Sequence, residues 1–144
     1  MFSHIVIAWD GSEHARRAFD YAIAIAERFG ARVEVVSVAR APDHAETSQE
    51  RASSIADARA FYERRALPLI EHARERGVEA RLVVVEGDHP ADDVITAAHQ
   101  LGADLIVVGR RGLSPVERFL SGSVSDRISR YAPCAVLVVG SEPA

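Results

Sequence analysis

The chain has 144 residues, 48% of them hydrophobic, and a formal net charge of −4. This size and apolar content are typical of one compact domain with a buried core, and the mildly acidic balance argues against nucleic acid as a partner. Cys134 is the only cysteine, which excludes an intrachain disulfide and a cysteine metal cluster. All 17 basic residues are arginines, so a lysine-containing P-loop and Schiff-base chemistry are excluded as well.

The first residues, MFSHIVIAW, lack a basic lead and a long apolar run. No segment approaches the roughly 18 apolar residues that a membrane span requires. We therefore expect a cytoplasmic protein without a membrane partner.

The first elements follow a strand, helix, strand order. Residues 4–9 are mostly apolar and predict a strand that stops at the turn pair Asp10-Gly11. Ser12 can cap a helix with helical apolar spacing that ends at Gly30. Residues 33–39 form a second apolar run. Such a unit predicts a parallel strand pair with a right-handed crossover.

The middle of the chain is less regular. Residues 40–54 are small and polar and predict a loop. A long helix is expected over residues 55–76, and Pro68 should kink it or split it. Residues 79–85 predict a third strand.

The last third continues the alternation. A helix is expected from Pro90 to the glycine at 102, a strand over 104–108, a loop over 113–121, a helix over 123–131 and a strand over 134–139. Five strands alternating with helices predict an α/β fold, a single domain over residues 1–144 with a doubly wound parallel sheet. In such a sheet, ligands bind at the carboxyl ends of the strands.

The stretch 109–125, GRRGLSPVERFLSGSVS, has the character of an anion-binding loop. Gly109 and Gly112 lack a Cβ, so backbone N–H groups can approach an anion closely. Gly122 and Ser123 open the last helix, whose first amides are unpaired and carry its positive dipole end, and Ser123 and Ser125 add hydroxyl groups. Residues 109–131 hold five arginines against two acidic residues. Together these features predict a phosphate site.

The spacing of this stretch is glycine, two residues, glycine, nine residues, then Gly-Ser. It resembles the signature of the ATP-binding branch of the universal stress protein family. The opening HIVIAWDGSEHA and the ending YAPCAVLVV are also similar to that family's first and last strands. The resemblance covers nearly the whole chain and is weakest over residues 41–54. It implies strand order 3-2-1-4-5 with helices on both faces, so strands 1 and 4 would be neighbours.

The resemblance also implies a nucleotide pocket for ATP, which magnesium can accompany through the phosphate oxygens. Asp10 would accept hydrogen bonds from the ribose, although it could instead only stabilise its turn. Trp9 stands where the family more often has a small aliphatic residue, and its indole could pack into the core or stack beside the ligand. The full set of expected binding residues is Ala8, Trp9, Asp10, Val38, Ala39, Val108, Gly109, Arg111, Gly112, Gly122, Ser123, Val124 and Ser125.

The expected function is that of an ATP-binding regulatory protein of the stress response, with slow hydrolysis at most. A fast enzyme needs a positioned nucleophile at the γ-phosphate, for which the chain offers no obvious residue. The six histidines show neither metal spacing nor a convincing base. The alternatives are an ATPase or nucleotidyl transferase, and a structural dimer without nucleotide. The resemblance implies a homodimer through the strand that begins at Cys134 and ends at Val139, and the protein partner is not identifiable.

Overall fold

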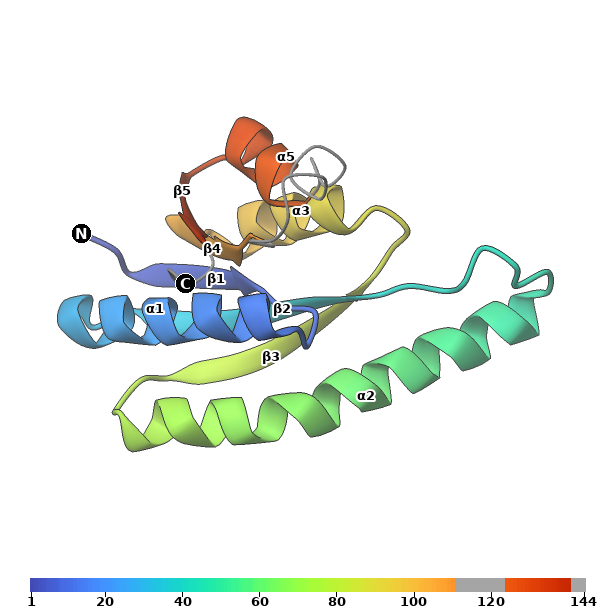
Figure 1. Cartoon of the computed structure of the whole chain (residues 1–144), viewed down its shortest axis with the longest axis horizontal. Helices are drawn as coiled ribbons and strands as arrows, with labels where there is room; N and C mark the ends of the chain where they lie inside the picture. Colours follow the sequence, from blue (N-terminus) through green and yellow to red (C-terminus); the bar gives the residue numbers. More distant parts are fainter. Residues whose placement is uncertain (111–123, 141–144) are drawn as a thin grey trace.

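The computed structural model describes residues 1–110 and 124–140 (Figure 1). Its strands form one parallel sheet in the order β3-β2-β1-β4-β5, which confirms the predicted α/β class and strand order. The elements are β1 (His4–Ala8), α1 (Glu13–Phe29), β2 (Arg32–Ala39), α2 (Ser48–Glu75), β3 (Ala80–Glu86), α3 (Pro90–Leu101), β4 (Leu105–Gly109), α5 (Val124–Tyr131) and β5 (Ala135–Val139).

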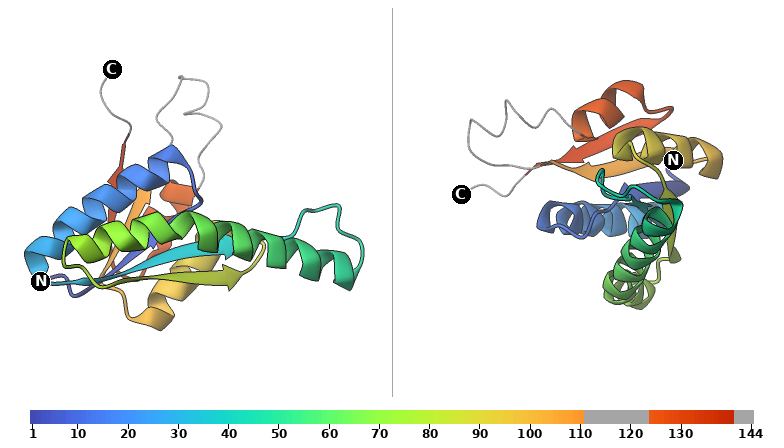
Figure 2. Two further views of the ribbon diagram at one scale, coloured as in Figure 1. Left: turned by 90° about the horizontal axis from the view of Figure 1, so that it is seen from below. Right: turned by 90° about the vertical axis from the view of Figure 1, so that its right-hand side faces the viewer.

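Helices cover both faces of the sheet, as predicted. Figure 2 shows α1 and α2 on one side and α3 and α5 on the other. Alternate residues of each strand point to opposite faces, so Ile5 and Ile7 of β1 pack with α1 and α2, whereas Val6 packs with α3 and α5. Two apolar clusters therefore hold the three layers together.

The ends of α1 follow the predicted chemistry. The Ser12 hydroxyl oxygen accepts a hydrogen bond from the amide of Ala15 at 3.2 Å and satisfies one of the free donors of the first turn. Gly30 ends the helix in the left-handed region, with φ of 67°. Both caps are confirmed.

The start of α2 differs from the sequence-based expectation. The predicted loop over 40–54 is too long, because α2 begins at Ser48 rather than near residue 55. Thr47 caps the helix by accepting a hydrogen bond from the amide of Glu50 at 3.0 Å, and the Glu50 carboxylate accepts one from the amide of Glu46 at 2.8 Å. This Thr-x-x-Glu pattern is a capping-box sequence, which starts a helix without any apolar periodicity.

Pro68 does not split α2. The helix runs unbroken through it, although the expectation of a split near residue 67 was based on the hydrogen bond that proline removes. Ala66, Leu69 and Ala73 are buried on both sides of the proline and anchor the last turns of the helix to the sheet. The Pro68 side chain itself faces solvent.

The last predicted loop, over 113–121, lies outside the described residues, and α5 is described from Val124. The predicted strand boundaries agree with those of the structure within one residue. For example, β4 and β5 each begin one residue later than expected. Among residues 1–110 and 124–140, no helix combines the length and the apolar character that crossing a membrane requires.

Candidate functional site

The carboxyl ends of β1 and β4 meet at the centre of the sheet, where Ala8 pairs with Val108. The next element after β1, α1, covers one face of the sheet, and the next described element after β4, α5, covers the other. The connections that follow these two neighbouring strands lie on opposite faces of the sheet, and doubly wound sheets bind ligands in a crevice at such a point. We name the region at the carboxyl ends of β1 and β4 the crevice. The predicted site residues that the structure describes lie on the elements around this point.

The turn after β1 places Asp10 at the mouth of the crevice. Its Oδ1 accepts a hydrogen bond from the amide of Ser12 at 3.0 Å, and Gly11 has a φ of 85° that a larger residue would rarely adopt. The Asp10 side chain is 55% exposed. The carboxylate therefore stabilises its own turn and still reaches solvent.

Gly109 ends β4 in close contact with the first turn of α1. A Cβ at this position would collide with the carbonyl oxygen of His14. Glycine is thus required here for the approach of two backbones, independently of any ligand. The same contact brings the start of α1 against the strand that leads into the glycine-rich stretch.

Trp9 packs into the core rather than into the crevice. The residue is only 6% exposed, and its ring lies 6.1 Å from that of Tyr62 on α2. Its amide donates to the carbonyl of Val36, and its carbonyl accepts from the hydroxyl of Ser37 at 2.7 Å. Of the two alternatives for the indole, the structure has the one in which it is part of the interior.

The other predicted residues surround the same strand ends. Ala8 and Val108 belong to the apolar cluster under α3 and α5, Val38 and Ala39 end β2, and Val124 and Ser125 start α5, with Ser125 buried. Four predicted phosphate-binding residues lie outside the described part of the chain: Arg111, Gly112, Gly122 and Ser123.

The comparison with known families decides the relationship. The model of the universal stress protein family matches residues 1–140. The chain belongs to the universal stress protein family.

Individual relatives agree with this assignment. A Staphylococcus aureus (strain USA300) protein named as a universal stress protein is 36% identical over 142 residues, which are 98% of this chain and 86% of that protein. The crystal structure of a family member from Burkholderia pseudomallei is 28% identical and covers 97% of both chains with a TM-score of 0.79. A universal stress protein solved in complex with cAMP is 25% identical, covers 98% of this chain and 99% of its own, and has a TM-score of 0.77.

Two residues at the crevice of this family member had no place in the sequence-based expectation. The Nε2 atom of His14 lies 3.1 Å from the Ser12 hydroxyl oxygen and 3.8 Å from Oδ2 of Asp10. Burial, and secondarily the negative charge of Asp10, raise the pKa of Tyr62. A histidine in the sequence pattern DGSEH was visible, but Tyr62 is more than fifty residues away along the chain and could be found only in three dimensions.

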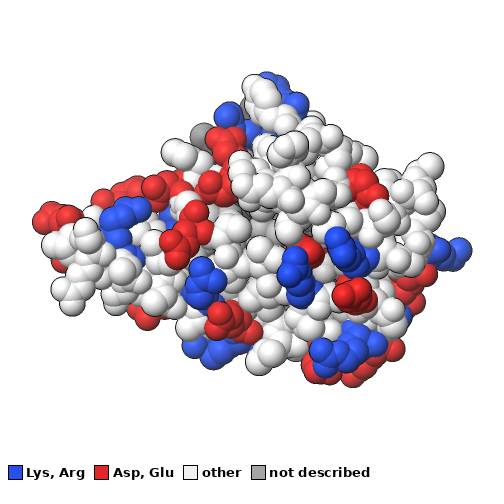
Figure 3. All heavy atoms as spheres, turned by 180° about the vertical axis from the view of Figure 1, so that it is seen from behind, with Lys and Arg blue, Asp and Glu red and all other residues white. Residues whose placement is uncertain are grey.

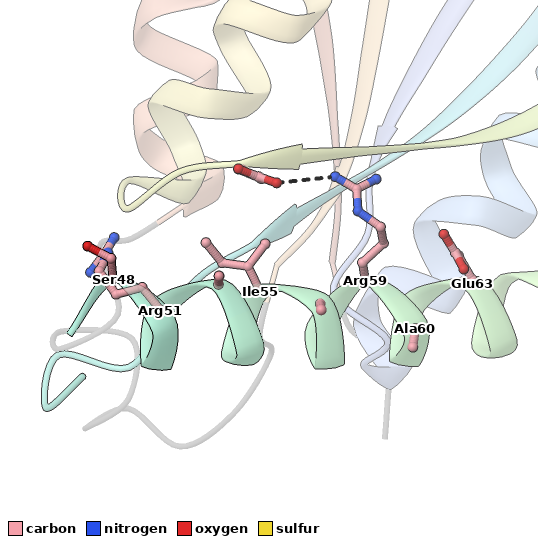
Figure 4. A pocket seen from close by; sticks show the side chains of 9 residues that line it. Ser48, Arg51, Ile55, Arg59, Ala60 and Glu63 are labelled. Carbon is pink, nitrogen blue, oxygen red and sulfur yellow. Dashed lines mark ion pairs between the residues drawn. The ribbon is translucent and has the colours of Figure 1, made fainter. Parts of the chain in front are cut away.

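A first hollow lies away from the crevice, between α2 and the carboxyl end of β3, and measures about 520 Å³ (Figure 4). Arg59 points from α2 toward the strands, and its guanidinium lies 3.6 Å from the Glu86 carboxylate. Arg51 likewise lies 3.3 Å from Asp88. Because both arginines have acidic partners, this groove offers little charge to an anionic ligand.

A second hollow of about 740 Å³ lies between the starts of α3 and α5. The Arg127 Nε donates to Asp92 at 2.6 Å, and the guanidinium lies 5.0 Å from the centre of the Tyr131 ring. This arrangement ties the two helices to each other. Neither hollow is lined by Asp10 or Gly109.

The surface charges and the possible metal ligands bear on two other classes of binding partner, nucleic acids and metal ions. Acidic and basic side chains are interspersed on the face shown in Figure 3, whereas a nucleic-acid surface needs a continuous basic patch. In the part of the chain that the structure describes, no group of three or more His, Cys, Asp or Glu side chains could hold a metal ion.

Proposed function

We propose that this universal stress protein binds an adenine nucleotide, ATP with Mg²⁺, across the carboxyl ends of β1 and β4. The observation that carries the proposal is the juxtaposition of Asp10, at the end of β1, with Gly109, at the end of β4, in the central crevice of a doubly wound sheet. The universal stress protein solved with cAMP supports an adenine nucleotide as the ligand class. Bound ATP would act as a regulatory signal in a stress response.

Different parts of the nucleotide would contact different strand ends. We propose that Asp10 accepts the ribose hydroxyls, since an ionised carboxylate has only acceptor atoms. Val38 and Ala39 would border the base on the β2 side. Ala8 and the backbone of Trp9 lead into Asp10, and Val108 would line the phosphate side. The backbone around Gly109, Arg111, Gly112, Gly122 and Ser123, with Val124 and Ser125, would hold the phosphates, and Mg²⁺ would bind through phosphate oxygens.

The whole chain is proposed to act as one nucleotide-binding domain in the cytoplasm. We also propose that two copies pair through β5, and that nucleotide occupancy changes a surface that a further protein partner reads. Hydrolysis is slow at most, because the proposed site supplies positive charge for the phosphates but no obvious residue to position an attacking water.

Isothermal titration calorimetry tests the binding. ATP with Mg²⁺ should bind in the micromolar range, about −8 kcal/mol, and less tightly without the metal. Gly122→Asp should bind ATP at least about tenfold more weakly than Gly122→Asn, because only the first puts a negative charge beside the phosphates. The asparagine variant is the matched control for side-chain size.

The outcomes separate the parts of the proposal. Absence of heat for ATP, ADP and AMP with the unchanged protein refutes nucleotide binding. Equal affinities of the Asp and Asn variants reject the phosphate site at residue 122. Phosphate release near the ~10 s⁻¹ typical of enzymes would move the protein into the enzyme class.

A further inference from the structure

We infer that His14 is a further ligand-contacting residue of this site and that its imidazole, together with the Ser12 hydroxyl, donates a hydrogen bond to a phosphate group of the nucleotide. The inference rests on the proposed function and names a residue for it on α1, outside the glycine-rich stretch. Three side chains at the carboxyl end of β1 support the inference: Asp10, Ser12 and His14.

The position of His14 is fixed from two sides. Its backbone carbonyl lies against Gly109, the last residue of β4, so the residue stands directly beside the strand that enters the glycine-rich stretch. Its Nε2 atom lies 3.1 Å from the Ser12 oxygen and 3.8 Å from Oδ2 of Asp10. The side chain is 25% exposed, so it is held in place and can still be reached by a ligand.

The hydrogen bonds of this cluster leave a donor available. The Ser12 oxygen already accepts from the amide of Ala15 at 3.2 Å. If the Ser12 hydroxyl donates to Nε2, the neutral imidazole carries its hydrogen on Nδ1; if Nε2 donates to Ser12, the hydroxyl hydrogen is free. The first arrangement is the one that the proposed contact requires, because it leaves the imidazole N–H for an outside acceptor, and a phosphate oxygen is a strong one.

Two of the described arginines near the crevice have other neighbours. The guanidinium of Arg110 lies against Gly140 beyond β5, and that of Arg16 donates to Asp20 at 3.1 Å. His14 is a side chain of α1 that can offer a hydrogen-bond donor at the end of β1. Its contact with β4, rather than with the end of β2, puts it on the proposed phosphate side and not on the base side.

The test compares ATP with adenosine, which has no phosphate, in the unchanged protein and in His14→Ala. We expect the variant to lose about tenfold or more in affinity for ATP and to change less than twofold for adenosine. His99→Ala is the matched control, because His99 is an exposed histidine of α3 on the opposite face of the sheet, and it should bind both ligands normally. The midpoint of thermal unfolding should agree between the two variants, since the Ser12 cap is kept.

A second measurement tests the role of His14 when adenosine binds too weakly for its affinity to be determined. In ¹H–¹⁵N spectra of the histidine side chains, the His14 ring nitrogens should shift on addition of ATP and shift much less with adenosine, which reaches only the neighbouring Asp10. If the unchanged protein binds neither ligand, the proposed function fails. If it binds ATP but His14→Ala retains the affinity within twofold, or the ring nitrogens do not respond, the role of His14 is refuted while the proposed function stands.

Discussion

At the scale of single residues, Asp104 fastens the amino terminus to the amino end of the central strand β4, at the end of the sheet opposite the crevice. Its Oδ2 accepts from the amide and hydroxyl of Ser3 at 2.9 and 3.0 Å, and its Oδ1 accepts from the amide of His4 at 3.1 Å. Burial would raise the pKa of Asp104, but these hydrogen bonds to the carboxylate together outweigh it and hold the pKa below its ordinary value. The ionised form of Asp104 therefore stabilises the fold.

Replacing the Asp104 carboxylate should make the free energy of unfolding depend less on pH in the acidic range. A pKa that is lower in the folded than in the unfolded chain contributes stability above about pH 4, and this contribution is lost as the pH falls through the folded value. We expect Asp104→Asn to lower the free energy of unfolding by about 1 kcal/mol at pH 7, a modest figure because water screens the site. Urea unfolding at pH 7 and pH 3 checks this, and an equal loss at both pH values would contradict it.

At the scale of elements, helices differ in how their boundaries are encoded. α1 packs along its whole length through buried residues such as Ala15, Phe19 and Ala26, so apolar periodicity predicted the helix and its Ser12 and Gly30 caps predicted its ends. The first half of α2 extends beyond the strands in Figure 1, and its buried residues begin only at Ala66. Periodicity could not locate that start, which is encoded by the Thr47 cap.

β5 is the element on which the proposed assembly depends. Within the described chain it pairs with β4 alone, so its other edge offers backbone donors and acceptors to a further strand. Ala135–Val139 is apolar throughout, with Ala135 exposed. An edge of this kind favours pairing with a second copy of the chain.

Native mass spectrometry tests that pairing. We expect a species of twice the 15.6 kDa chain mass. Ala135→Arg, which places a charge on the exposed edge, should shift the population toward single chains. A single-chain mass for the unchanged protein at micromolar concentration would exclude the homodimer.

At the scale of the whole molecule, the layer order determines where a ligand can bind. The strand order follows from the family resemblance, and the position of the crevice follows from the strand order, so both could be predicted from the sequence. The contacts of His14 and Tyr62 could not, because they depend on how α1 and α2 lie against β4 and the Asp10 turn. The orientation of the Trp9 indole likewise depends on Tyr62, a partner distant in the sequence.

We expect an adenine nucleotide to bind at the carboxyl ends of β1 and β4. The most direct test of this binding is a ¹H–¹⁵N correlation spectrum of the protein titrated with ATP and Mg²⁺. The amide resonances of Asp10, Ala39, Gly109 and Ser125 should shift together with one affinity, while that of Ile55 in the α2 groove stays unchanged. A spectrum that does not change at saturating ATP, or one in which only the α2 groove responds, would contradict the account.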